Sequence, residues 1–373
     1  MDKPLKQLLW LTLGFKVAVL LAAFLAPYFF SFNTANYLAN FHYPANALPD
    51  TWTSLKTWDA QHYLCLADQG YSPGDWDNVF FPLWPFLIHL TGPLFFGNNL
   101  AAGLVLSLLF TLASMVFLYL LVKPSCGTET AFNTGLFLLA FPTGFYMSLV
   151  YTEALFLTLA TAYFYFSREG KIGPAAFCAF LLPLTRPLGV LILPAACLWI
   201  WTSKKKKSLS FWRLLEPAGF LLGFELYLML MKAFTGDYWA GFSTQGHYLS
   251  HNDLSHLMNP FQWFFNNFIH IHYSLLGVEN DPLNRLFFLA FVAALVLSYR
   301  ILDKGLWAYA LILGLFPAMI SDLMSYMRYL VGVFPLFIFL AQKWGPQRKY
   351  YLLACLPLQG VFLVLHALND WVA

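Results

Sequence analysis

The segment LLWLTLGFKVAVLLAAFLAPYFF, residues 8–30, contains one charged residue, Lys16. A helix needs about 20 apolar residues to cross a bilayer, so this segment is long enough to do so. The whole chain has the same character, because 60% of its 373 residues are hydrophobic and only 10% are charged. An ordinary soluble domain has about 25% charged residues. The sequence therefore predicts an all-α polytopic membrane protein.

We expect about eleven apolar segments, including the first, to cross the membrane as helices. They are residues 8–30, 99–122, 131–149, 152–167, 174–185, 188–202, 213–234, 285–301, 306–320, 328–342 and 350–368. The further apolar stretch FFPLWPFLIHLTGPLFF, residues 80–96, contains three prolines, and proline disfavours the interior of a helix. We expect this stretch to lie along the outer membrane surface or to re-enter the membrane.

Lys and Arg residues indicate the orientation of these segments, because short loops that carry them stay on the cytoplasmic side. Most of them fall on one side of the predicted topology: Lys3, Lys6, Lys123, Arg168, Lys171, Lys204 to Lys207, Arg213, Arg300, Lys304, Lys343, Arg348 and Lys349. The outer side holds only Lys56, Arg186, Lys232, Arg285 and Arg328. We therefore expect a multi-pass plasma membrane protein, built as a single domain over residues 1–373 with outer loops 31–98 and 235–284.

Composition and cysteine spacing argue against other classes of protein. The net charge of +3 is small and the basic residues lie in short clusters between apolar runs, so nucleic-acid binding has no support. The five cysteines show no CxxC pattern and no metal-ligand spacing, and we expect no disulfide framework. Membrane lipids are the partners that the composition predicts.

The first outer loop contains an acid in a distinctive position. In TWDAQHYLCLADQGY, residues 57–71, Asp59 directly follows Trp58. The segment predicts an amphipathic helix with Trp58, Tyr63, Leu64 and Leu66 on its apolar side. Asp59 is then either a solvated loop residue or a base held at the membrane surface.

Three further ionisable residues lie at the outer ends of apolar spans, namely Glu153, Arg186 and Arg328. Ionisable residues at membrane depth are costly and usually functional, although Glu153 is also a candidate structural partner for one of the arginines. Both arginines lie on the side that topology normally empties of cations. Because a guanidinium group is suited to bidentate phosphate binding, we expect an anionic ligand at the outer leaflet.

Several motifs occur in a characteristic order along the chain. They are Trp58-Asp59, Gly70-Tyr71, FFPLWP at residues 80–85, FP at 141–142 with YTE at 151–153, TRP at 185–187, and Arg328 with Pro335. This order resembles the phosphatidylinositol-glycan class V (PIG-V) family, which holds the transferase for the second mannose of GPI anchors and its prokaryotic relatives. The chain is shorter than we expect of a eukaryotic GPI enzyme, so a prokaryotic relative is favoured.

The resemblance implies a C-type (GT-C) glycosyltransferase bundle whose long first outer loop carries the catalytic acid. It also implies transfer of a hexose, mannose above all, from a polyprenyl- or dolichyl-phosphate donor to a lipid- or glycan-linked acceptor on the outer face. Asp59 is the expected base of an inverting reaction, and Arg186 and Arg328 are expected to bind the donor phosphate. The residues expected to contact substrate are Trp58, His62, Tyr63, Tyr151, Glu153 and Tyr326.

A transporter or flippase of a lipid-linked or anionic substrate is the rival hypothesis, since arginines in broken helices also suit that task. The sequence shows no inverted repeat that would favour it. The histidine pairs His247/His251 and His270/His272 have spacings that a metal site could use. We interpret them instead as polar loop residues or sugar-contacting groups, and expect no metal site, while a divalent cation requirement stays open.

Overall fold

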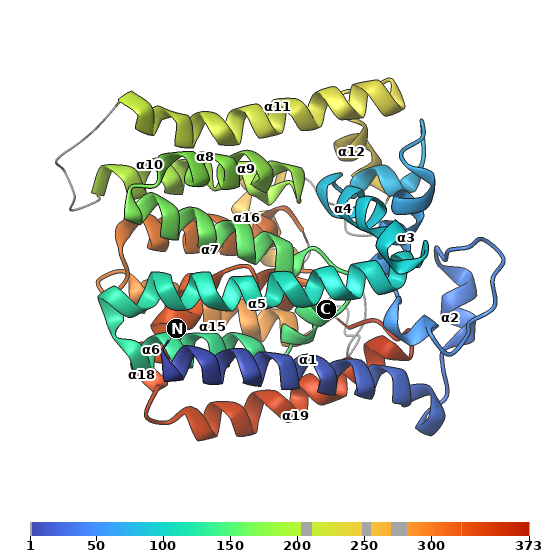
Figure 1. Cartoon of the computed structure of the whole chain (residues 1–373), viewed down its shortest axis with the longest axis horizontal. Coiled ribbons are helices and arrows are strands. Elements are labelled where there is room, and N and C mark those ends of the chain that lie inside the picture. The colour runs from blue at the N-terminus through green and yellow to red at the C-terminus, as the bar shows by residue number, and fades with distance from the viewer. Residues whose placement is uncertain (1, 203–210, 248–254, 270–281, 322, 373) are drawn as a thin grey trace.

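The computed structural model describes residues 2–202, 211–247, 255–269, 282–321 and 323–372. Within these ranges the chain forms helices and contains no β-strand. Figure 1 shows the long helices lying side by side along one direction, with shorter helices gathered at one end. The prediction of an all-α membrane protein is therefore confirmed, whereas the number of crossings stays a prediction.

Four helices in the described ranges are long and apolar enough to cross a membrane. They comprise α1 (Lys3–Phe29), α5 (Asn99–Cys126), the segment Phe211–Thr235 that contains α11 (Leu215–Thr235), and α19 (Arg348–Ala367). Shorter apolar helical segments accompany them: Leu83–Phe95, Ile172–Leu184, Leu188–Thr202, Pro282–Ser298 and Lys304–Ile320. Apolar helices of this length suit a lipid environment, because a helix satisfies its backbone hydrogen bonds internally and so needs no water to pair with its N–H and C=O groups.

The centre of the bundle is α7 (Glu153–Glu169), whose residues from Glu153 to Phe164 are all buried. It packs between α5 and α8 (Ile172–Leu181). The outer helices instead expose large apolar side chains, for example Trp10, Leu21, Leu109, Leu222, Leu289, Val296 and Leu353. A helix that is buried all round lies inside a bundle, and one with an apolar outer face borders lipid. Lys16 of α1 is also buried and donates a hydrogen bond to Ser107 of α5.

Proline breaks shape one end of this bundle. The predicted span 131–149 is helical only as α6 (Thr128–Ala140), because Pro142 interrupts it before the 3₁₀ turn η4 (Gly144–Ser148). Likewise α8 gives way to η5 (Leu182–Leu184), and Arg186 follows in the turn before Pro187. Non-helical backbone at membrane depth is found where it is buried in protein or lines a cavity.

The last predicted spans show the same behaviour. The span 328–342 is divided into α17 (Tyr326–Leu330) and α18 (Phe334–Trp344). The remaining described helices are α9 (Leu188–Leu191), α10 (Leu193–Thr202), η6 (Phe211–Leu214), α12 (Ala240–Ser243), η7 (Thr244–His247), α13 (Ser255–Met258), α14 (Pro260–Phe264), η8 (Phe265–Ile269), α15 (Pro282–Ser298) and α16 (Lys304–Ile320). Arg328 thus lies beside an interruption of the helical structure, as Arg186 does.

The first predicted outer loop, residues 31–98, caps this end of the bundle (Figure 1). It contains α2 (Thr34–Ala39), η1 (Thr53–Leu55), α3 (Asp59–Gln69), η2 (Trp76–Val79), α4 (Leu83–Thr91) and η3 (Gly92–Phe95). The helix expected within residues 57–71 is present as α3, but it has no exposed polar face between Ala60 and Ala67. Trp58 precedes the helix as its N-cap residue, and the residues of α3 from Ala60 to Ala67 are buried, because α4, α5 and η2 pack against them.

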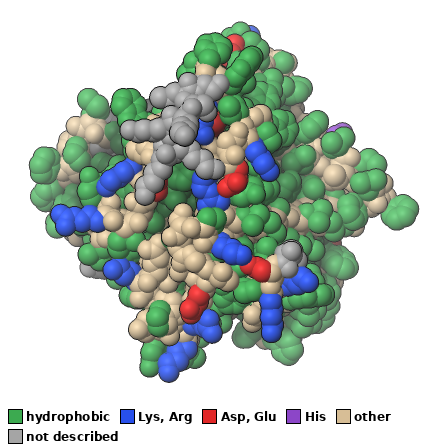
Figure 2. Space-filling view, turned by 60° about the vertical axis from the view of Figure 1, so that its left-hand side comes forward, with side chains coloured by type: hydrophobic (Ala, Val, Ile, Leu, Met, Phe, Trp, Pro, Cys, Tyr) green, Lys and Arg blue, Asp and Glu red, His purple; other side chains and the backbone are tan. Residues whose placement is uncertain are grey.

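Lys and Arg side chains gather at the opposite end of the bundle, as Figure 2 shows. There α5 ends just after Lys123, α7 ends just after Arg168, and α16 and α19 begin at Lys304 and Arg348. The structure thus places these basic residues at one end of the bundle, and the assignment of that end to the cytoplasmic side stays a prediction.

The two ends of the bundle should therefore differ in accessibility. In a chain whose five cysteines are replaced by alanine, an impermeant thiol reagent should label Asp75→Cys in intact cells, because Asp75 is exposed in the capping loop. The same reagent should label Lys349→Cys, which is exposed at the basic end, only after permeabilisation. Labelling of Lys349→Cys in intact cells would contradict the predicted orientation.

Candidate functional site

Arg328 connects two carboxylates from distant parts of the chain. Its Nε donates a hydrogen bond to Oε1 of Glu153 over 2.7 Å, and its Nη1 donates to Oδ2 of Asp59 over 2.6 Å. Arg186 completes the group, since its Nη2 lies 3.0 Å from the same Oε1 of Glu153 and also donates to the hydroxyl of Thr152. The structure thus brings Asp59, Glu153, Arg186 and Arg328 into one ion network with two negative and two positive charges.

The secondary structure explains where the two carboxylates lie. Asp59 is the first residue of α3 and Glu153 is the first residue of α7. The N-terminus of a helix carries a partial positive charge, which stabilises an anionic side chain placed there. Both carboxylates therefore have a favourable backbone environment in addition to the arginines.

The backbone is strained at or near the residue before two of these charged side chains, directly before Asp59 and three residues before Arg328. Trp58, which precedes Asp59, has a φ angle of 56°, and Ser325, which lies three residues before Arg328, has a φ of 58°. Side-chain-bearing residues rarely adopt this left-handed region, and doing so costs about 1–3 kcal/mol at each position. Such strain persists only where the surroundings hold it, and it is found most often at functional sites.

The four side chains differ in exposure. The Glu153 side chain is 1% exposed and that of Asp59 is 25% exposed, while Arg328 and Arg186 are at 14% and 12%. Oε2 of Glu153 is buried and has no hydrogen-bond partner among the described residues. Glu153 is therefore the buried centre of the network, and Asp59 is the carboxylate that a ligand can reach.

Two tyrosines form an aromatic wall behind Arg328. Its guanidinium carbon lies 5.0 Å from the ring centroid of Tyr146 and 4.7 Å from that of Tyr151, distances at which a cation is attracted to a π face. The Tyr151 hydroxyl donates to the carbonyl of Thr57 over 3.0 Å. This contact ties η4 and α7 to the residue that precedes the Trp58-Asp59 pair.

A small cavity of about 10 Å³ adjoins the network. It is lined by Trp58, Asp59, Tyr146, Tyr151, Arg328, His366, Trp371 and Val372. A cavity of this size holds about one water molecule. Trp371 and Val372 come from the segment that follows α19, and His366 lies near the end of α19. No motif in the sequence marks these three residues, and sequence reasoning did not single them out.

Besides Glu153, three of the predicted substrate contacts do not line this cavity. His62 is buried, its Nδ1 lies 2.5 Å from Oδ1 of Asp77, and its ring stacks on Phe41 and Phe80. Tyr326 is fully buried and donates its hydroxyl to the carbonyl of Gly314 over 3.0 Å. These residues are packed behind the site as part of the fold.

Tyr63 is the third of these residues and lies closest to the network. Its ring centroid is 6.5 Å from that of Tyr151 in an edge-to-face contact. Burial raises the pKa of the Tyr63 hydroxyl, and the negative charge of Asp59 raises it further. Tyr63 therefore stays a neutral phenol beside the acid.

The histidine pairs considered as metal ligands fall mostly outside the described residues. His251, His270 and His272 lie in undescribed segments, and the side chain of His247 is likewise not described. Within the described ranges, no group of three or more His, Cys, Asp or Glu side chains is placed to hold a metal ion.

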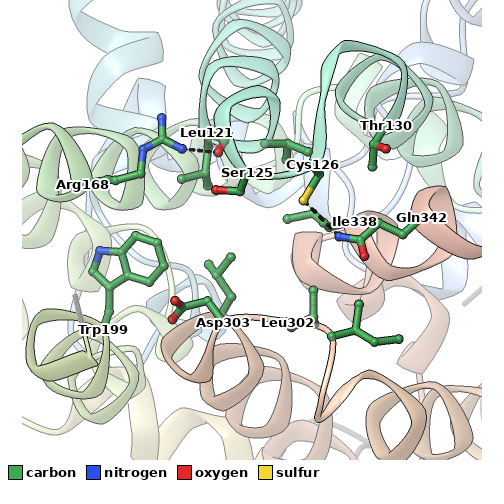
Figure 3. Close-up of a pocket in the computed structure, with 13 residues that line it drawn as sticks. Leu121, Ser125, Cys126, Thr130, Arg168, Trp199, Leu302, Asp303, Ile338 and Gln342 are labelled. Atoms are coloured by element: carbon green, nitrogen blue, oxygen red, sulfur yellow. Dashed lines mark hydrogen bonds between the residues drawn. The ribbon is translucent and has the colours of Figure 1, made fainter. Parts of the chain in front are cut away.

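A larger cavity of about 460 Å³ lies at the basic end (Figure 3). Arg168, Asp303 and Gln342 are among its lining residues, and Arg168 donates to the carbonyls of Leu120 and Leu121. Arg168 and Glu153 stand at opposite ends of α7, about 22 Å apart at the rise of an α-helix. This cavity is therefore separate from the ion network.

Comparison with known families supports a common origin for the first half of the chain. A family model described as Mannosyltransferase (PIG-V) matches residues 6–187. The matched region includes Asp59, Glu153 and Arg186, whereas Arg328 lies beyond it and is joined to the other three by its contacts in the structure. No curated protein matches the chain.

The difference in burial predicts different effects on stability. Glu153→Gln should lower the free energy of unfolding by about 3 kcal/mol, because it leaves two largely buried arginines without their shared partner. Asp59→Asn should cost about 1 kcal/mol or less, because Asp59 is partly exposed and Arg328 keeps Glu153. Thermal unfolding in detergent measures both, with Glu129→Gln, an exposed acid at the first turn of α6, as control. Equal effects of the two site variants would contradict the assignment of Glu153 as the centre.

Proposed function

We propose that this chain, whose residues 6–187 match the model of the PIG-V mannosyltransferase family, is a membrane glycosyltransferase that moves a hexose from a polyprenyl- or dolichyl-phosphate donor. The acceptor is a lipid- or glycan-linked hydroxyl, and the sugar favoured by the family is mannose. The reaction takes place at the end of the bundle capped by residues 31–98, on the outer face of the membrane, in a C-type glycosyltransferase architecture. The observation that carries the proposal is the contact between Asp59 and Arg328 beside a small cavity.

The charge balance of the network suggests how donor binding prepares the base. Two carboxylates and two guanidinium groups sum to zero, so the network holds no spare positive charge for a phosphodiester. A donor phosphate must compete for Arg328, and Asp59 is the weaker competitor because it is the more exposed carboxylate. Binding of the phosphate to Arg328 thus frees Asp59 from its ion pair at the time when a base is needed.

The chemical step is then a single displacement. Asp59 accepts the proton of the acceptor hydroxyl as its oxygen attacks the anomeric carbon, and general-base help of this kind contributes about 10²- to 10⁴-fold. The bond between the anomeric carbon and the phosphate oxygen breaks on the opposite face, and the polyprenyl phosphate leaves with the electron pair. Arg328 and Arg186 stabilise the charge that develops on the leaving phosphate. The configuration at the anomeric carbon is inverted.

The base assignment predicts the effect of Asp59→Asn, which keeps the size of the side chain but removes the proton acceptor. Turnover should fall by about 10²-fold or more, while donor binding persists. The measurement is acceptor-dependent release of lipid phosphate from a radiolabelled polyprenyl-phosphate mannose by the purified protein.

Asp75→Asn is the matched control, because Asp75 is an exposed acid of the same loop. Asp77 and Asp68 are unsuitable, since Asp77 pairs with His62 and Asp68 accepts hydrogen bonds from Tyr43 and Asn99. An Asp59→Asn variant that transfers sugar at the wild-type rate would remove the base assignment. A wild-type protein that moves the donor across a membrane without releasing lipid phosphate would favour the transporter hypothesis.

The phosphate assignment predicts weaker donor use by Arg328→Lys and Arg186→Ala. Hydrogen bonds to charged groups contribute about 1.5–3 kcal/mol, so the donor concentration at half-saturation should rise by about tenfold to hundredfold. Lysine keeps the positive charge at position 328 but lacks the planar guanidinium group that binds phosphate with two hydrogen bonds. A weaker affinity of Arg328→Lys for the donor therefore reports the loss of that hydrogen-bond geometry and not a loss of charge. Wild-type donor saturation in both variants would rule out phosphate binding by these arginines.

A further inference from the structure

The cavity beside Asp59 is closed by the segment that follows α19. Two asparagines near the start of α2 hold this segment. Asn33, just before α2, donates a hydrogen bond to the carboxylate of Asp370 over 2.7 Å. Asn36, within α2, donates to the carbonyl of Asn369 over 2.8 Å. The hydroxyl of Tyr146 donates to the carbonyl of Val372 over 2.7 Å. Residues 369–372 are thus fixed against the same tyrosine that stacks on Arg328.

This segment adds an aromatic ring to the cavity. The ring centroids of Trp58 and Trp371 lie 4.8 Å apart with their planes at 88°. Two perpendicular indole rings form an apolar corner, one side of which comes from the residue next to Asp59. Tryptophan in such a place offers a large rigid apolar face together with a polar N–H group.

Two residues that line the cavity also carry unsatisfied nitrogen atoms. Nε1 of Trp58 and Nδ1 of His366 are buried and have no hydrogen-bond partner among the described residues. Most buried polar atoms in folded proteins have a partner, and an exception calls for an explanation. A ligand with hydroxyl groups in this cavity would supply the missing partners.

We propose that Trp58 and Trp371 form the binding subsite for the hexose ring of the donor, with the nitrogens of Trp58 and His366 contacting its hydroxyls. A pyranose ring has an apolar face of C–H groups and a rim of hydroxyls, which matches an aromatic corner flanked by unpaired nitrogens. The subsite rests on the proposed function, because it places the sugar between Asp59 and the phosphate held by Arg328.

The size of the cavity determines which part of the wall moves when the sugar enters. About 10 Å³ admits one water molecule and no hexose. Trp58 is fixed at the N-terminus of α3 and Tyr151 at the start of α7, whereas Trp371 lies outside any helix. We therefore expect the Trp371 side chain to move when the sugar binds. It leaves its edge-to-face contact with Trp58 and packs against the apolar face of the sugar.

The test compares binding of two lipids to the purified full-length protein. One is polyprenyl-phosphate mannose, and the other is polyprenyl methyl phosphate, which keeps the single phosphodiester charge but lacks the sugar. Trp371→Ala should bind the mannose lipid about tenfold more weakly than the wild type, as expected for the loss of an aromatic contact. Its affinity for the methyl ester should stay within about twofold of the wild type, because the phosphate site is intact.

Two further variants sharpen the test. Trp371→Phe keeps an aromatic face and should retain part of the sugar preference, and Trp76→Ala removes an exposed tryptophan of the capping loop and should change neither affinity. A Trp371→Ala protein that binds both lipids like the wild type, or loses both equally, overturns the subsite.

The assay also separates this proposal from the proposed function. Binding is measured without acceptor, so it does not depend on transfer. If the wild type releases no lipid phosphate when acceptor is added, the proposed function fails. If it does release lipid phosphate but binds the mannose lipid no more tightly than the methyl ester, the subsite alone is wrong.

Discussion

The ion network around Glu153 is the constraint on which the rest of the structure depends. A charged side chain among apolar helices is costly unless it is paired, and Glu153 is almost fully buried. Its two partners come from the turn after η5 and from α17, and Arg328 reaches on to Asp59 of the capping loop. The proline breaks that end α6 and η5 allow these turns to meet. The position of the helices at this end of the bundle follows from that requirement.

The two carboxylates of the network have different roles because they differ in solvent exposure. The buried carboxylate holds both arginines in place, and the exposed one shares only Arg328. An arrangement of this kind keeps the cations oriented while one of its anions is exchanged for a ligand. The strained backbone at Trp58 and Ser325 fits the same picture, because the direction of Asp59 and Arg328 is maintained against local preference by the packing around them.

The sequence predicted the parts of this structure that depend on apolar length and on the sign of charges. The spans around α1, α5, α11 and α19 followed from their composition, and Arg186 and Arg328 were identified because they lie on the side poor in cations. The pairing of Glu153 with an arginine was predicted, and the structure confirms it. That Glu153 pairs with both arginines and that Arg328 also contacts Asp59 was not predictable, since these contacts depend on turns whose geometry leaves no periodic signal. The helix α3 was predicted, but its burial was not, because α4, α5 and η2 cover a face that periodicity assigns to water. Trp371 was missed because a lone aromatic residue after an apolar span is most simply a residue of the membrane interface.

The order of the network along the chain has a consequence for how the protein is made. Glu153 precedes Arg328 by 175 positions, and Asp59 precedes it by 269. A ribosome adds about 5–20 residues per second, so Glu153 waits roughly ten to thirty seconds for Arg328 to be synthesised. During that interval Arg186, which is 33 residues after Glu153, is already synthesised and can pair with the Glu153 carboxylate. The early helices can therefore enter the membrane with a balanced charge, and the contact that joins Asp59 to the site forms only when α17 arrives.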